Sequence, residues 1–348
     1  MSYHRFQSER ARRRQFATTQ PQNADGLSYA GELADTYVAP AIKAGETLAN
    51  NWVSQMDGLS SKAQITGAVV TDPVQAASCN FDTSQDNVSL TERTLTLSDL
   101  QVNEQLCRGT ILPTWHAVRG TRNSDWAVDE FRNFVLGEIA AKTAESVETL
   151  IWQGGTVMDQ GFLSNDGTLD ADGLTNSSLA GATTQDITAI TANNVINGFG
   201  LVHQKAATDK SAIMAKPDLN FYVSPKTFAL YQQALATAGG ALTSAASDDS
   251  VTYGNGQGVN NASVNQNLST LTYLGTPIRR CPGMFDDAIL LTTQSNLFVG
   301  SNLRTDYTQV QYIPVYQYDG SDNVRVVMRF GLGTQSGVPT DAVLGKTY

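Results

Sequence analysis

The sequence is short of charged residues and of cysteine. Asp, Glu, Lys and Arg make up 16% of its 348 residues, against roughly a quarter in a typical soluble domain. A surface with so few charges is either uncharged and polar or covered by a partner. Cys79, Cys107 and Cys281 lie far apart and form no CxxC pair. This spacing argues against a disulfide framework or a zinc site and favours a reducing compartment.

Long hydrophobic runs are also missing. The longest aliphatic run, AILL at residues 288–291, is far too short to span a bilayer. The N-terminus carries charges with no apolar stretch after them, unlike a secretory signal. The sequence therefore predicts a soluble protein that has no membrane partner.

Motifs for catalysis and metal binding are missing as well. His4, His116 and His203 are scattered and form no HExxH pattern, and no serine lies in a GxSxG turn. The aspartate-rich loop at 166–172 lacks the glycine and the closing glutamate of a calcium-binding EF-hand loop. We therefore expect no catalytic residue, no metal site and no cofactor.

The first thirty residues contain a cluster of arginines, the one feature that indicates a kind of binding partner. They show no apolar periodicity and read as an extended arm. Within the first twenty residues the net charge is +4, which leaves −14 for the rest of the chain. Such an arm suits contacts with phosphates or with carboxylates of a neighbouring subunit, and a solubilising tail is the alternative. The arginines that we single out are Arg5, Arg10, Arg12, Arg13 and Arg14.

Residues 58–98 alternate in the manner of β-strands. AQITGAVV and VSLTERTLTLSDL place apolar or β-branched residues at every second position, with Gly, Pro, Asn and Asp between the runs. This pattern predicts a long hairpin. Large aliphatic residues are few there, so we expect the hairpin to lie on another surface.

A helix is predicted over residues 125–152. Ser124 or Asp125 can cap its start, Glu138 and Lys142 are spaced as an i to i+4 pair, and Gly154 with Gly155 ends it. It would be about 42 Å long, more than a compact domain of this size needs. The residues expected to pack along it are Val128, Phe131, Val135, Ile139, Val147 and Trp152.

The rest of the chain mixes helices and strands. A helical pattern at 187–207 precedes a short strand, NFYVSP, and a helix that opens at Ser224 and Pro225. Strand-like runs close the chain. At 348 residues the chain exceeds one usual hydrophobic core, so we expect two compact regions of an α+β protein.

Several of these segments resemble the major capsid proteins of tailed bacteriophages, which have the Hong Kong 97-type fold. LTLSDLQVNEQLCRGTILPTW, followed by LGEIAAKTAESVETLIWQG, resembles the family's approach to a long spine helix ending in Glu-x-x-x-Trp-x-Gly, here Glu148, Trp152 and Gly154. DADGL, NFYVSPKTFALYQQAL, LTYLGTPIRRCPGM and AILLTTQSNLFVGSNL resemble later parts of the family in the same order. The resemblance covers about residues 55–340.

The resemblance implies an α+β Hong Kong 97-type capsid fold and a domain order. The expected segments are an N-terminal arm at 1–57, an extended β-hairpin loop at 58–98, a peripheral domain at 99–185 with the spine helix at 125–152, an axial domain at 186–305, and C-terminal strands of the peripheral domain at 306–348.

The function that the resemblance implies is structural, not enzymatic. Copies of the chain would form hexamers and pentamers of an icosahedral shell, the virion capsid, around double-stranded DNA, assembled in the host cytoplasm. Portal and scaffold proteins would be further partners, and whether decoration proteins bind is open. No Lys and Asn pair aligns for covalent crosslinking, so Lys62 and Lys346 have no assigned role.

Two other hypotheses stay open. An encapsulin-like nanocompartment resembles the same fold but encloses enzymes instead of DNA. A remote alternative is a cytosolic hydrolase that pairs Cys107 or Cys281 with His116 or His203.

Overall fold

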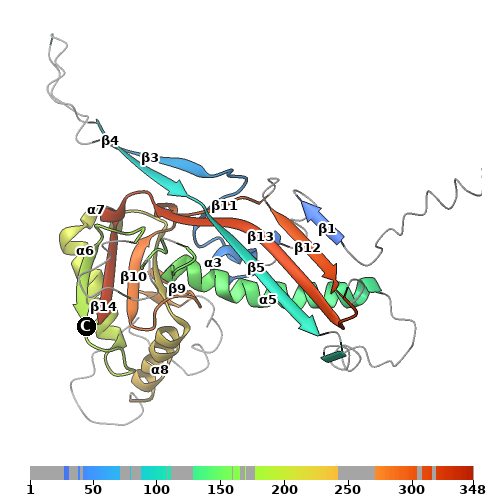
Figure 1. Ribbon diagram of the computed structural model, residues 1–348. Coiled ribbons are helices and arrows are strands. Elements are labelled where there is room, and N and C mark those ends of the chain that lie inside the picture. The colour runs from blue at the N-terminus through green and yellow to red at the C-terminus, as the bar shows by residue number, and fades with distance from the viewer. Residues whose placement is uncertain are drawn as a thin grey trace, which may run out of the picture.

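The computed structural model describes the chain in thirteen segments. They are residues 27–30, 38–39, 42–70, 79, 88–107, 109–110, 128–158, 160–164, 169, 177–241, 271–303, 308–315 and 319–347. Helices and strands both contribute, in two six-stranded sheets, one two-stranded sheet and several helices (Figure 1). The expected α+β class is confirmed.

The first sheet is organised around one long strand. β13 (Asn323–Ser336) pairs with β5 (Ser98–Cys107) on one side and with β12 (Gln309–Pro314) and β11 (Leu297–Ser301) on the other. β1 (Leu27–Ala30) extends the sheet beyond β12, and β2 (Ser54–Met56) extends it beyond β11. β5 is therefore an outer strand.

The second sheet is buried on both faces. Its order is β6 (Thr183–Ile187), β14 (Ala342–Thr347), β10 (Ala288–Thr293), β7 (Leu219–Val223), β9 (Thr276–Arg280) and β8 (Thr272–Tyr273). On β7, Phe221 and Val223 belong to one hydrophobic cluster and Tyr222 belongs to another. Successive side chains of a strand point to opposite faces, so the all-apolar run of this strand reflects two covered faces.

Helices cover one of those faces. α6 (Val195–Asp209) and α8 (Pro225–Ala241) pack on the side of Phe221, and the short α7 (Ser211–Met214) follows α6. Ser224 caps α8 as expected, because its Oγ accepts a hydrogen bond from the Thr227 amide at 3.2 Å. The helix predicted at 187–207 begins later, at Val195, since β6 occupies residues up to Ile187.

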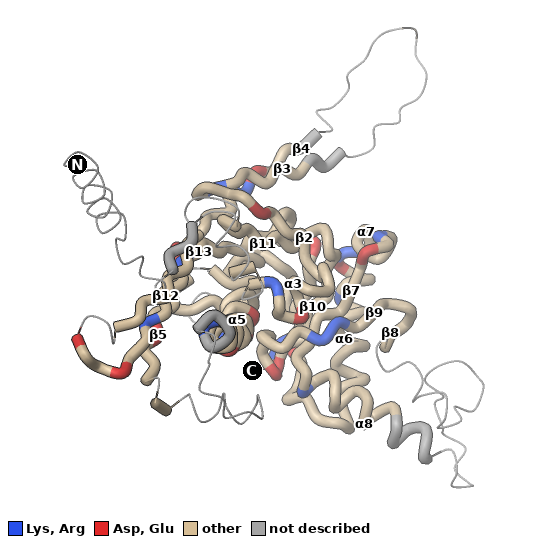
Figure 2. Tube along the Cα trace, turned by 90° about the vertical axis from the view of Figure 1, so that its right-hand side faces the viewer, with Lys and Arg blue, Asp and Glu red and all other residues tan. Residues whose placement is uncertain are grey.

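The helix α5 (Val128–Gln153) lies between the two sheets. Figure 2 views it nearly end-on, with β5, β12 and β13 on one side and β7, β9 and β10 on the other. Its 26 residues give a length of about 39 Å. The predicted glycine stop is present, because Gly154 (φ 64°) and Gly155 (φ 149°) have backbone angles that only glycine adopts without strain. A short helix, α3 (Glu46–Ala49), comes from the segment before the hairpin.

Strands on either side of residue 305, where the resemblance implies the end of the axial domain, pair with distant segments. β11 precedes that boundary and belongs to the first sheet, whereas β14 follows it and belongs to the second. β11 pairs with β13, and β14 pairs with β10. Sequence periodicity carries no information about such partners.

Candidate functional site

A two-stranded hairpin projects from the body of the molecule. β3 (Lys62–Val70) and β4 (Val88–Thr96) pair antiparallel over their full length, from Lys62 opposite Thr96 to Val70 opposite Val88. Among the described residues, no third strand pairs with either. Both views show the hairpin standing away from the sheets (Figures 1 and 2). Its outer backbone edges are thus open for pairing with another chain.

The base of the hairpin is fastened to the body. Leu95 is fully buried, and its side chain covers Gly300, where an added Cβ would come within 2.5 Å of it. Arg93 donates to the Ser178 carbonyl at 3.0 Å and to the Ser336 hydroxyl at 2.8 Å. Further out, Leu90 is 72% exposed. The hairpin therefore has a fixed base and an apolar side chain available beyond it.

The spine-helix residues named from the sequence are largely buried. Val135, Ile139 and Val147 lie in the main hydrophobic cluster, and Trp152 is fully buried. Val128 begins α5, but its side chain and that of Phe131 lie outside the described set. The expected pairing of Glu138 with Lys142 is corrected, because Lys142 instead contacts Glu145 at 3.1 Å.

Buried hydrogen bonds that the sequence did not indicate hold the C-terminal end of α5 in place. The indole of Trp152 donates to the Thr47 hydroxyl at 3.0 Å, and this hydroxyl contacts the carboxyl group of Glu148. The Thr47 amide donates to the same carboxyl oxygen at 3.3 Å. Tyr222 of the second sheet packs on the Trp152 ring, with centroids 5.6 Å apart. Three distant parts of the chain thus meet here.

Glu148 is the unusual member of this cluster. It is buried, and its Oε2 has no hydrogen-bond partner within the described part of the chain. Burial raises the pKa of the carboxyl group, because desolvation disfavours the charged form. The motif Glu-x-x-x-Trp-x-Gly was visible in the sequence, but Thr47 lies about a hundred residues earlier and no local signal points to it.

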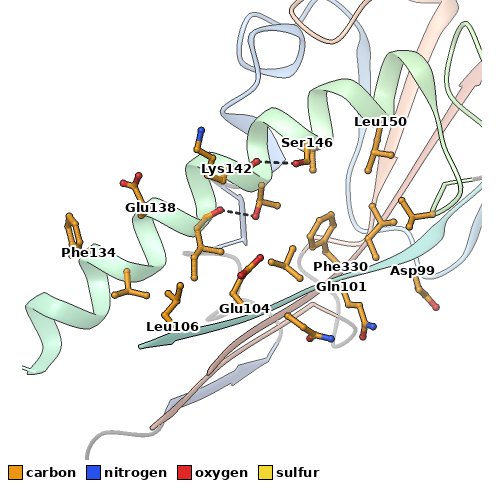
Figure 3. Close-up of a pocket in the computed structure, with 18 of the residues that line it drawn as sticks. Asp99, Gln101, Glu104, Leu106, Phe134, Glu138, Lys142, Ser146, Leu150 and Phe330 are labelled. Carbon is orange, nitrogen blue, oxygen red and sulfur yellow. Dashed lines mark hydrogen bonds between the residues drawn. The ribbon is translucent and has the colours of Figure 1, made fainter. Parts of the chain in front are cut away.

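A groove runs between α5 and β5 (Figure 3). Its volume is about 1150 Å³, and residues of both elements together with Phe330 of β13 form its walls. We call it the α5–β5 groove. Its apolar lining residues are Leu100, Val102, Leu106, Phe134, Val135, Ile139, Val147, Leu150, Val157 and Phe330, and its charged ones are Asp99, Glu104, Glu138 and Lys142.

The residues weighed for catalysis do not form a reactive group where they are described. Cys281 is fully buried, and burial raises the pKa of its thiol well above the usual value, which disfavours the reactive thiolate. Cys107 is exposed at the end of β5. His203 packs beside Tyr273, with ring centroids 6.2 Å apart, and burial lowers its pKa. His116 lies outside the described residues.

The remaining expectations concern metal binding, membrane spans and the arginines of the arm. Within the described segments, no three His, Cys, Asp or Glu side chains come together as metal ligands. No helix in the same segments is both long and apolar enough for a membrane span. The five arm residues Arg5, Arg10, Arg12, Arg13 and Arg14 lie outside the described set.

Comparison with known proteins gives likeness in structure only. No family model and no curated protein sequence matches the chain. A chain in the procapsid of satellite phage P4, which includes the size determination protein, is 12% identical. The match covers 90% of this chain and 97% of that one, with a TM-score of 0.50. This likeness concerns the fold, and it confirms the expected Hong Kong 97-type α+β architecture.

Two further solved structures match over similar lengths. The capsid of cyanophage P-SCSP1u is 10% identical, covering 88% of this chain and 89% of that one, with a TM-score of 0.49. A virus-like particle from Pyrococcus furiosus is 10% identical, covering 91% of this chain and 99% of that one, with a TM-score of 0.47.

Proposed function

We propose that this chain is a shell-forming subunit, the major capsid protein of a tailed phage, which assembles around double-stranded DNA. The fold shared with a phage procapsid chain supports a structural role without catalysis. In this proposal the copies form hexamers and pentamers of an icosahedral shell. Portal and scaffold proteins are partners in assembly.

The observation that carries the proposal is the β3–β4 hairpin. A two-stranded hairpin is marginal in water unless its face is covered. Here the base is anchored through Leu95 and Arg93, while Leu90 is left 72% exposed. Beyond this base, the exposed Leu90 adds no buried apolar surface to an isolated subunit. A neighbouring copy could cover Leu90 and pair with the open strand edges, as in β-strand addition.

The packing of α5 behind the hairpin supports the same function. α5 spans the molecule between two sheets, and its end is fixed by Thr47, Glu148 and Trp152. A shell subunit has to transmit force between its neighbours without unfolding. Closed symmetry then lets every copy use the same contacts and leaves few edges free.

The charge distribution of the chain suits a shell that encloses DNA. The body carries −14 and the first twenty residues carry +4. An acidic body repels a polyanion, so DNA contacts would be left to the arm, and they would be non-specific and sensitive to salt. The alternative is a nanocompartment that encloses enzymes, and the contents distinguish the two.

Electron microscopy of the expressed chain tests the proposal. We expect closed shells of uniform size, alone or with a co-expressed scaffold, that contain nuclease-protected double-stranded DNA in infected cells. A co-purifying enzyme inside the shells would replace the phage assignment with the nanocompartment. Protein that stays monomeric under all assembly conditions, with no shells in cells that express its partners, would refute both.

A further inference from the structure

The α5–β5 groove presents an open strand edge beside an apolar wall. β5 pairs with β13 on one side only, and among the described residues no strand covers its other side. Leu100, Val102 and Leu106 line the groove from this strand, opposite side chains of α5 such as Leu150 (Figure 3). An extended segment that entered the groove would gain both backbone pairing and apolar contact.

One carboxylate interrupts the apolar side of β5. Residues 100, 102, 104 and 106 point to the same face of the strand, and Glu104 is the charged member of that series. Figure 3 shows its side chain between β5 and the helix. No side chain of the described residues forms an ion pair or hydrogen bond with it. The groove therefore offers an exposed carboxylate beside an apolar wall, with Asp99 and Glu138 outnumbering Lys142 among its other charged residues, which fits a cationic and partly aromatic segment.

The N-terminal arm has the matching chemistry. Residues 1–20 carry +4, with arginines clustered between Phe6 and Phe16. Ten extended residues span about 33 Å, which is also the length of the ten-residue strand β5. Arginine can bind a carboxylate through two parallel hydrogen bonds and is weakly hydrated, so it suits a half-apolar site.

The first described strand, β1, lies in the same sheet as β5. Leu27 of β1 pairs with Tyr312 of β12, which pairs with Val326 of β13, and Val326 pairs with Glu104 of β5. Leu27 and Glu104 are therefore three strand spacings apart, about 14 Å. Leu27 is opposite Tyr312, and residue 30 is opposite Gln309. The chain therefore enters β1 from the side of the sheet where β5 ends. The 26 residues before Leu27 can extend up to about 85 Å, which is long enough for the arm of the same copy to reach the groove.

We propose that in the unassembled subunit the arginine arm, residues 1–20, binds in the α5–β5 groove of its own chain, with an arginine paired to Glu104. The groove would thereby hold the cationic arm against the body until a stronger partner displaces it. The proposal concerns the free subunit and does not depend on shell formation.

Cys107 gives a direct test because it is exposed at the end of β5. The full-length subunit would carry Ala11→Cys in the arm and Cys79→Ser to remove the other exposed thiol, while Cys281 is buried. A short bis-maleimide reagent at low protein concentration should link residues 11 and 107. Mass spectrometry of a mixture of isotope-labelled and unlabelled protein should show the link within single chains.

Two charge variants make the test specific. Glu104→Gln should lower the yield of the crosslink about two- to fivefold, the range expected for the loss of one ion pair. Glu92→Gln removes the same charge from an exposed position on β4 and should leave the yield unchanged. Equal yields in both variants, or links that join only different chains, would overturn the proposal. So would a yield that is insensitive to added salt.

Discussion

At the scale of single residues, Glu148 is the most unusual group in the described structure. Its carboxyl group is buried beside Thr47 and Trp152, and its Oε2 has no partner within the described segments. An ionised carboxylate in such a place is costly, so the folded protein retains the proton to higher pH than the unfolded chain.

This retention predicts a pH-dependent stability. An unfolded glutamate loses its proton near pH 4.3. Above about pH 4 the folded state therefore binds more protons than the unfolded state, and the free energy of unfolding falls as pH rises. Glu148→Gln removes this titration but keeps an oxygen that can accept from Thr47. The variant should therefore gain stability relative to wild type as pH rises from about 4 to 7.

Urea denaturation of the unassembled subunit at several pH values measures this difference. Glu145→Gln is the control, because Glu145 is exposed on the same helix. Its stability relative to wild type should vary far less over the same range. A flat difference between wild type and Glu148→Gln would show that Glu148 ionises normally in the folded state.

Thr47 links two buried polar groups. Its hydroxyl accepts from the Trp152 indole at 3.0 Å and contacts the Glu148 carboxyl group. Thr47→Val keeps the shape but leaves both groups short of a partner, so we expect a loss of about 2–4 kcal/mol in the free energy of unfolding. Thr149→Val, at an exposed site on α5, should change it by less than about 0.5 kcal/mol. Thermal or urea unfolding compares the two variants.

At the scale of elements, α5 determines how the two sheets are held. Val135, Ile139 and Val147 belong to a cluster that also contains residues of both sheets, such as Val326 and Leu344. The helix therefore contributes little stability by itself and gains most of it from packing on its surroundings.

Ile139→Asp tests this packing. An unpaired carboxylate would enter the main cluster, and we expect a loss of about 3 kcal/mol or more, with no assembled shells. Ile139→Val should cost only about 0.5–1.5 kcal/mol and should still assemble, which separates failure to fold from failure to assemble. Glu145→Gln should be tolerated. Normal shells from Ile139→Asp would mean that the packing of α5 is not needed for the fold.

At the scale of the whole molecule, the projecting hairpin is the feature that one subunit does not explain. No third strand of the described chain pairs with it and Leu90 is exposed, while Leu95 at its base is part of the core. The proposed shell supplies the missing surface through a neighbouring copy.

Leu90→Asp tests the contact without disturbing the core. The side chain is 72% exposed, so the free subunit should unfold at the temperature of wild type, whereas shell formation should be lost or strongly reduced. Leu274→Asp is a matched control, because Leu274 is equally exposed but lies at the turn between β8 and β9. Light scattering and electron microscopy compare assembly. Equal assembly by both variants would exclude Leu90 from the contact.

The sequence by itself determined the local features of the fold. The stop of α5 at Gly154, the cap of α8 at Ser224 and the alternation of the hairpin strands depend on neighbouring residues, so their patterns can be read along the chain. The resemblance of ordered segments then indicated the architecture. Domain boundaries and the role of the arginine arm stay predictions.

Only the tertiary structure decided which distant residues meet. Thr47 reaches Glu148 across 101 residues, and Arg93 reaches Ser336 across 243. Lys142 contacts Glu145 although Glu138 has the expected spacing. Glu104 was an ordinary strand residue in the sequence, and it became a candidate binding group because β5 is an outer strand beside α5. Such pairings follow from the packing of whole elements, which local periodicity does not encode.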